Sequence, residues 1–252
     1  MTLGWLLILS AVIGCSSAQG AEQAVGAAAE ERLVFNISWT HLPVPAGEAT
    51  LEYQHTDTEP QQRGGDYQIR GTLRGLGLVQ TLYRINDLFL TYGTGHGRAM
   101  LTDVHIKRQG HRNKRTEYRF RRQEGVVVRT VDEQEPTTME VAEFQVDDPL
   151  TLLYRVRSLA QLQPGLQFDE HIVDGDKIAS VHLSVGEREK RLTPVGQFEV
   201  MPVYPQLPDS KLLRHKGDLT VWLTDDDRRL PVRIESKVKI GAIAVDLVAH
   251  HP

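Results

Sequence analysis

The sequence predicts a mainly β protein, built as an antiparallel sheet with one short helix at about residues 148–160. In most of the chain, apolar residues alternate with polar ones, and this period of two is typical of strands with one buried face. The pair Asp174-Gly175 separates two such runs and is a strong hairpin signal. After Asp148-Pro149, in contrast, apolar residues repeat every three to four positions, which predicts the helix.

Composition limits the range of functions. A chain of 252 residues is long enough to form a core without disulfides or a metal. Its net charge of −4 at pH 7 gives no basic field for nucleic acid, so we expect no nucleic-acid partner. The glycine-rich stretches LRGLGLVQ and GTGHG lack the spacing of a phosphate-binding loop, so we expect no cofactor.

The first residues predict export from the cytoplasm. Residues 1–14 resemble a signal peptide, because their apolar run is about half as long as a spanning helix. Cys15, the single cysteine, follows in VIGC, which resembles a lipobox and predicts lipidation, with residues 15–31 as a flexible tether. Ser16 resembles the residue after the cysteine in outer-membrane lipoproteins. Simple cleavage near Ser16-Ser17-Ala18, giving a soluble periplasmic protein, and an uncleaved anchor remain alternatives.

Strands are expected in order along the first half of the chain. Alternation over residues 33–40 and 49–53, around the turn HLPVPAG, predicts a hairpin. A third strand begins at Tyr67, and a fourth covers residues 82–92. The stretch 104–122 has eight Lys or Arg against one Glu, and its alternation predicts a hairpin with an apolar inner side and a cationic outer side.

Two interpretations of this basic hairpin stay open. Its charges are either offset on a solvated face by the acidic stretch that follows, or they contact an anionic envelope component such as lipid head groups or acidic polysaccharide. The second interpretation assigns the contact to four residues: Lys107, Arg108, Arg119 and Arg121.

The predicted helix has clear boundaries. Asp148 is expected as its N-cap and Pro149 in its first turn, and the helix ends before Gln163-Pro164-Gly165. Its leucine stripe should pack on the sheet. Arg157 is expected to pair with a carboxylate at the edge of the core, which is a structural role.

The second half predicts further strands around Asp174-Gly175. Asp169 and His171 share a strand face, but no third ligand joins them at a recognised spacing, so no metal site is expected. Near the C-terminus, TDDDRRLP joins two alternating runs. Its charged residues are expected to form a turn with mutual ion pairs at a solvated tip. Apolar positions change from even to odd numbers around Gly241, which predicts a β-bulge there.

Three segments together resemble a known family: DDPLTLLYRVRSLAQLQPG, VGEREKRLTPVGQFEVMPVYP and GDLTVWLTDDDRRLPVRIESKVKIGAIAVDLV. They resemble the bacterial exported domain of unknown function (DUF) family 3108 over about residues 33–248. The resemblance implies a single β-rich domain at 32–250, with a curved antiparallel sheet or partly open β-barrel around the helix. Its general shape would be similar to lipoprotein carriers of the LolA and LolB type. The residues that carry the resemblance in the helix and the last hairpin are Asp148, Tyr154, Arg157, Trp222, Asp226, Arg229, Pro231 and Gly241.

The resemblance brings no activity with it, and no nucleophile elbow or catalytic set is visible in the sequence. We therefore expect a non-enzymatic envelope protein on the periplasmic side, anchored to the outer membrane through Cys15, that binds a lipid-like, amphiphilic or anionic component. A structural or interaction protein without a ligand cavity is one alternative, and an enzyme whose site assembles only in space is another.

Overall fold

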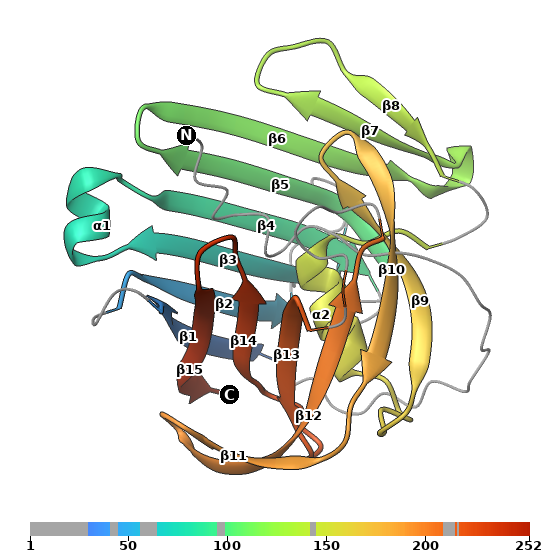
Figure 1. Cartoon of the computed structure of the whole chain (residues 1–252). Coiled ribbons are helices and arrows are strands. Elements are labelled where there is room, and N and C mark those ends of the chain that lie inside the picture. Colours follow the sequence, from blue (N-terminus) through green and yellow to red (C-terminus); the bar gives the residue numbers. More distant parts are fainter. Residues whose placement is uncertain are drawn as a thin grey trace. The chain divides into compact units, whose positions relative to one another are not determined.

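The computed structural model describes residues 30–40, 45–55, 65–94, 99–141, 145–208, 215 and 217–252. Cys15 and the predicted signal peptide lie outside them. Fifteen strands form one antiparallel sheet, which confirms the predicted mainly β fold class (Figure 1). Among the described residues, no helix is long and apolar enough to cross a membrane.

Two compact units make up the chain. We call Ala27–Phe144 with Leu247–Pro252 the N-terminal unit, and Gln145–Asp246 the C-terminal unit. The elements of the N-terminal unit are β1 (Glu30–Trp39), β2 (Gly47–His55), β3 (Tyr67–Gly75), α1 (Gly77–Leu82), β4 (Asn86–Thr94), β5 (Ala99–Gln109), β6 (Arg112–Arg121), the 3₁₀ turn η2 (Arg122–Glu124), β7 (Val126–Val131) and β8 (Thr137–Glu140). Those that begin in the C-terminal unit are α2 (Pro149–Arg157), β9 (Gln167–Asp174), β10 (Lys177–Val185), β11 (Glu189–Thr193), β12 (Gly196–Gln206), β13 (Leu219–Thr224), β14 (Pro231–Lys237) and β15 (Ala242–His251).

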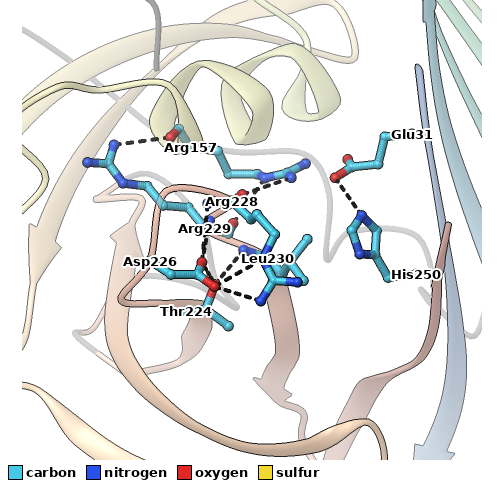
Figure 2. Close-up of polar contacts among 8 residues, drawn as sticks. All are labelled: Glu31, Arg157, Thr224, Asp226, Arg228, Arg229, Leu230 and His250. Atoms are coloured by element: carbon cyan, nitrogen blue, oxygen red, sulfur yellow. Dashed lines mark hydrogen bonds and ion pairs between the residues drawn. The ribbon is translucent and has the colours of Figure 1, made fainter. Parts of the chain in front are cut away.

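Strands of the N-terminal unit follow one another as a meander, because each of β1 to β7 pairs with the next strand along the chain, and β8 ends the series. The predicted first hairpin is confirmed, with Leu33 opposite Leu51. β1 begins at Glu30, so the end of the predicted tether is part of this strand. The last residues of β15 also belong to this unit, where His250 Nε2 lies 3.5 Å from Glu31 Oε1 (Figure 2).

In the C-terminal unit the strand order is β15-β14-β13-β12-β10-β9, and β11 pairs with β12. The expected Asp174-Gly175 hairpin is confirmed: Lys177 pairs with Asp174, and Gly175 has a positive φ of 65°. Leucines of α2 pack on this sheet, as the sequence predicts. The buried core that results consists of Leu152, Val156, Leu162, Ile172, Val181, Leu183, Val185, Met201, Val203, Leu207, Leu219 and Leu223.

The structure confirms the cap that predicted α2. Asp148 Oδ1 accepts hydrogen bonds from the backbone N–H groups of Leu150 (2.6 Å) and Thr151 (3.2 Å). Its Oδ2 accepts another from Thr151 Oγ1 at 2.7 Å. Pro149 occupies the first turn, where its missing N–H costs nothing. Because Asp148 is only 1% exposed, each of these bonds replaces one to water.

Two expectations about the chain path are wrong. Residues 77–82 form the short helix α1, so the fourth strand begins at Asn86 and not at residue 82 as expected. Gly241 is not a bulge inside a strand; it lies in the turn between β14 and β15 with φ 79°, and Val238 N donates to its carbonyl. The parity change arises because the register of this hairpin pairs even positions with odd ones, as with Ile234 and Val245. Ile240, expected in a strand, is 63% exposed in this turn.

Candidate functional site

One face of β4, β5 and β6 in the N-terminal unit combines aromatic, polar and cationic side chains. The strand register places Phe89 opposite His105 and Thr91 opposite Asp103. We call this surface the polar–aromatic face, and it consists of Phe89, Thr91, Asp103, His105, Lys107, Lys114, Thr116, Tyr118 and Phe120. Side chains at alternate positions of a strand share a face, so the register alone brings these residues together.

A buried carboxylate and a histidine lie near the centre of this face. Asp103 is 1% exposed, and its Oδ2 lies 2.8 Å from His105 Nε2. Thr91 Oγ1 donates to Asp103 Oδ1 at 3.4 Å. The His105 ring packs edge-on against Phe89, with centroids 4.8 Å apart, and against Tyr118, at 5.7 Å. Burying a carboxylate is costly unless it is paired, so the imidazole fixes Asp103 in this position.

Exposure and positive charge increase along the face toward the β5–β6 turn. Phe120 and Tyr118 are buried, with 8% and 4% of their surface exposed, whereas Lys107 is half-buried and Lys114 is exposed. Lys107 and Lys114 lie directly opposite each other in the register, a pairing that like charges disfavour. The polar–aromatic face is thus apolar toward one end and cationic toward the other.

Asp87 is a second buried carboxylate, near the cationic end. Its Oδ1 accepts from Arg108 N at 2.7 Å, and its Oδ2 accepts from Gln109 Nε2 at 2.6 Å. Burial raises the pKa of Asp87, although these hydrogen bonds and the nearby charges of Lys107 and His105 oppose the rise. The carboxylate ties the start of β4 to the end of β5.

The structure corrects the expected sides of the basic hairpin. The expected apolar inner side consists of Val104 and Ile106 on one strand and Tyr118 and Phe120 on the other. Val104 lies opposite Glu117, while Tyr118 lies opposite Asp103, so the two pairs are on different faces. Both faces of the hairpin are therefore mixed. Of the four predicted contact residues, Lys107 is on the polar–aromatic face. The other three, Arg108, Arg119 and Arg121, are on the opposite face.

Carboxylates within the hairpin already neutralise part of its charge. Glu117 accepts from Arg119 Nε at 2.7 Å and from Arg115 Nη2 at 2.5 Å. Burial alone would raise the pKa of Glu117, but the two guanidiniums outweigh it and hold that pKa below its usual range. Arg121 pairs with Glu124 at 3.2 Å. The carboxylates that balance these arginines therefore include Glu117 on the same strand and Glu124 in the turn that follows it.

In the C-terminal unit, the helix and the TDDDRR turn are joined by two arginines, as Figure 2 shows. Arg157 donates from Nε to the carbonyl of Arg229 (3.0 Å) and from Nη2 to that of Arg228 (3.2 Å). In return, Arg229 Nη1 donates to the carbonyl of Arg157 at 3.1 Å and to that of Leu159. We call this pair the arginine latch. It places a cation at the C-terminal end of α2, where the helix dipole favours positive charge.

Asp226 organises the turn itself. Its Oδ1 accepts from Thr224 Oγ1 (2.6 Å) and from the N–H groups of Arg228 and Arg229, and its Oδ2 accepts from Arg228 Nη2 at 2.7 Å. Burial alone would raise the pKa of Asp226, but these hydrogen bonds outweigh it and hold that pKa below its usual range. The expected ion pair is confirmed. The expected solvated tip is confirmed only for Asp227 and Arg228, which are exposed, whereas Arg229 is 9% and Thr224 1% exposed.

The other residues that carry the family resemblance also make structural contacts. Trp222 Nε1 donates to Glu189 at 2.7 Å, and the Arg191 guanidinium lies 3.9 Å from the centre of its ring. The Tyr154 ring lies under Arg157 at 4.9 Å. Pro231 begins β14 opposite Leu223, next to a register shift. The contacts at these positions are packing, hydrogen-bond and strand-pairing contacts.

Asp169 contacts His182, which lies on the neighbouring strand β10. Its Oδ1 lies 2.7 Å from His182 Nδ1, directly across from it in the register. Burial lowers the pKa of His171, and the carboxylates of Glu170 and Asp169 oppose this. The described part of the chain contains no group of three or more His, Cys, Asp or Glu side chains arranged to bind a metal ion.

Comparison with known proteins identifies the family. The family model "Protein of unknown function (DUF3108)" matches residues 34–248 and spans both compact units. The chain belongs to the DUF3108 family. No curated protein matches this DUF3108 chain. A crystal structure of a beta-barrel-like protein of domain of unknown function DUF1849 from Brucella abortus aligns with a TM-score of 0.58 and 12% identity, covering 88% of this chain and 97% of the other. That likeness shows the fold, and neither match gives a sign of enzymatic activity.

Sequence reasoning missed the cluster on the polar–aromatic face of this DUF3108 protein. Asp103 and His105 are two positions apart on one strand, which is a weak signal on its own. Thr91 joins them through the pairing of β4 with β5, and Tyr118 through β6. Only the strand register, which the sequence does not give, assembles the four.

Proposed function

We propose that this DUF3108 protein is a non-enzymatic binding protein of the bacterial envelope that holds an anionic amphiphile on the polar–aromatic face. The observation that carries the proposal is the gradient along this face, from buried aromatic rings to a pair of lysines. An amphiphile has the same two ends, so its tail matches the apolar end and its head group the cationic one.

The facing lysines favour an anionic head group. Two ammonium groups in register repel each other, and an anion bound between them replaces that repulsion with two attractive contacts. Nearby Asp87 offsets part of the positive charge, since the Lys107 charge acts on its carboxyl. Lys114 is exposed and is the more accessible of the two.

The central cluster suits recognition better than catalysis. In a hydroxyl–histidine–carboxylate triad the hydroxyl donates to the histidine, whereas here the Thr91 hydroxyl donates to the carboxylate of Asp103. His105 is 14% exposed and lies between two aromatic rings, where it supplies one polar contact on a mainly apolar surface. We propose that it contacts a hydroxyl or ester group of the ligand.

The predicted signal peptide and Cys15 support a place in the envelope. We propose a lipoprotein on the periplasmic side of the outer membrane, with a cleaved soluble periplasmic form as the alternative. The intact mass of protein purified from its own envelope distinguishes them. A mature chain that begins at Cys15 and carries acyl chains supports the anchor, and one that begins later without them supports the soluble form.

The same preparation tests the ligand by native mass spectrometry with lipid extraction. We expect an anionic amphiphile to co-purify, and Lys107→Glu with Lys114→Glu to reduce its occupancy at least about fivefold, because two attractions become repulsions. Arg119→Glu with Arg121→Glu is the matched control, on the opposite face of the same hairpin, in β6. Equal loss in both double variants would contradict the proposed face. A parent protein without any ligand would favour the interaction-protein alternative.

A further inference from the structure

One end of the N-terminal unit exposes large apolar side chains. Leu78 is 69% exposed, Leu82 is 82% exposed and Tyr83 is 37% exposed. The leucines are four positions apart on α1, so they share one face of this helix. No residue of α1 is buried. Figure 1 shows α1 at the end of β3 and β4, at the same end of the strands as the β5–β6 turn.

The backbone holds this exposed helix firmly in place. Leu76 N donates to the carbonyl of Ala46 at 3.0 Å, and Ile85 N donates to the Gln80 side chain at 3.1 Å. Gly110 N, in the β5–β6 turn, donates to the carbonyl of Arg84 at 2.7 Å. A Cβ at Gly110 would lie 2.8 Å from the Tyr83 ring, so the turn packs directly on α1. The exposed leucines therefore belong to an ordered surface.

Exposed arginines lie on the segments next to α1 and on the β5–β6 turn that packs against Tyr83. They come from the end of β3, the residues after α1 and both sides of the β5–β6 turn: Arg74, Arg84, Arg108 and Arg112. Within the part of the chain that the structure describes, none of the four forms an ion pair. Nearby, Glu48 lies opposite Arg74 in the register, and buried Asp87 accepts from the backbone of Arg108. The surface therefore carries a net positive charge.

We infer that this end, the docking end, binds the surface of an anionic lipid bilayer, with Leu78 and Leu82 entering the acyl boundary. Leucines flanked by arginines are the composition of interfacial helices, which combine apolar burial with attraction to acidic head groups. The inference goes beyond the proposed ligand and does not require it, since no residue of the docking end belongs to the polar–aromatic face.

A bilayer fits this surface better than a protein partner does. Stable protein interfaces need roughly 800 Å² on each side and an apolar centre depleted in charge. The docking end combines a small apolar area, from two leucines and one tyrosine, with the positive charge of four arginines. A lipid surface accepts both, because it offers acyl chains at one depth and phosphate groups just above them.

The test places a polarity-sensitive fluorophore at single positions of the full chain. Cys15→Ser removes the single native cysteine, and Leu82→Cys or Leu192→Cys supplies the labelling site. Leu192 is 83% exposed on β11 and is the matched control for exposure. On adding vesicles that contain phosphatidylglycerol, we expect a blue shift and a rise in emission at position 82. We expect little change at position 192, and little at either with phosphatidylcholine alone.

Charge variants then test the arginines. In the Leu82→Cys protein, Arg84→Gln with Arg112→Gln should raise the lipid concentration needed for half of the signal roughly 30-fold, about fivefold for each charge. Salt should have a similar effect, since it screens exposed charges. An unchanged signal at position 82, or equal changes at 82 and 192, overturns the inference. A response to phosphatidylcholine as large as that to anionic vesicles also overturns it.

Discussion

The arginine latch and the docking end use the same side chain in opposite ways. In the latch, Arg157 and Arg229 are 8% and 9% exposed, and their guanidiniums donate to backbone carbonyls. At the docking end, Arg84 and Arg112 are exposed and form no ion pair with the residues that the structure describes. Sequence composition alone does not separate the two, since arginines in or next to a turn contribute to both. The partner available to each guanidinium decides its role.

The carbonyls that the latch satisfies belong to a helix end. The last carbonyls of a helix lack partners within it, and Arg229 supplies donors to those of Arg157 and Leu159. Burial lowers the pKa of Arg229, while Asp225 and Asp227 oppose this. A buried cation is tolerated because its donors are used, so removing one partner leaves the others unsatisfied.

The largest expected effect follows from breaking the latch. Arg229→Met removes the guanidinium while keeping most of the side-chain volume, and it leaves one buried and one partly buried carbonyl without this donor. We expect the free energy of unfolding to fall by about 2–4 kcal/mol, measured by urea denaturation. Arg228→Met is the matched control, since the Arg228 side chain is 56% exposed; it should cost less than about 1 kcal/mol. Equal losses at the two positions would contradict the latch.

A smaller and pH-dependent effect is expected at Asp226. Its folded pKa lies below the usual value, so its ionised form stabilises the fold. That contribution is complete above the unfolded pKa of about 4 and is lost as the pH falls through the lower folded pKa. Asp226→Asn should therefore cost about 1 kcal/mol at pH 7, reduced by solvent screening at this partly exposed turn. The gap between variant and parent, followed by urea denaturation from pH 7 to 3, should narrow in acid. A constant gap would contradict this origin.

Local sequence signals predicted much of the fold. Asp148-Pro149 marked the start of α2, and Asp174-Gly175 marked a hairpin, because caps and tight turns depend on neighbours in the chain. The register of the strands is harder to predict from sequence, because it depends on contacts between strands. Alternation showed that Val104 and Tyr118 each face an apolar side, yet only the pairing of β5 with β6 showed that the two sides differ.

The candidate sites escaped prediction for the same reason. Arg229 is recognisable as a residue of a turn, but its burial depends on a helix about 70 residues earlier in the chain. Leu78 and Leu82 lie in a glycine-rich stretch without a long apolar period, so the sequence contains little sign of α1. Exposed leucines break the pattern that sequence reasoning relies on, which is that apolar residues are buried.

The smallest expected effect on stability lies at the docking end. Leu82→Ala removes a side chain that is 82% exposed, so little apolar burial is lost, and the free energy of unfolding should change by less than about 0.5 kcal/mol. Leu152→Ala is the matched control, because Leu152 lies on α2 at 6% exposure within the core of the C-terminal unit; it should cost about 2–5 kcal/mol. Urea denaturation of both variants measures the contrast. A large loss of unfolding free energy in Leu82→Ala would mean that this leucine stabilises the fold. Its presence on the surface would then be explained without binding to a membrane. A neutral Leu82→Ala that weakens binding to anionic vesicles would separate function from stability at the same residue.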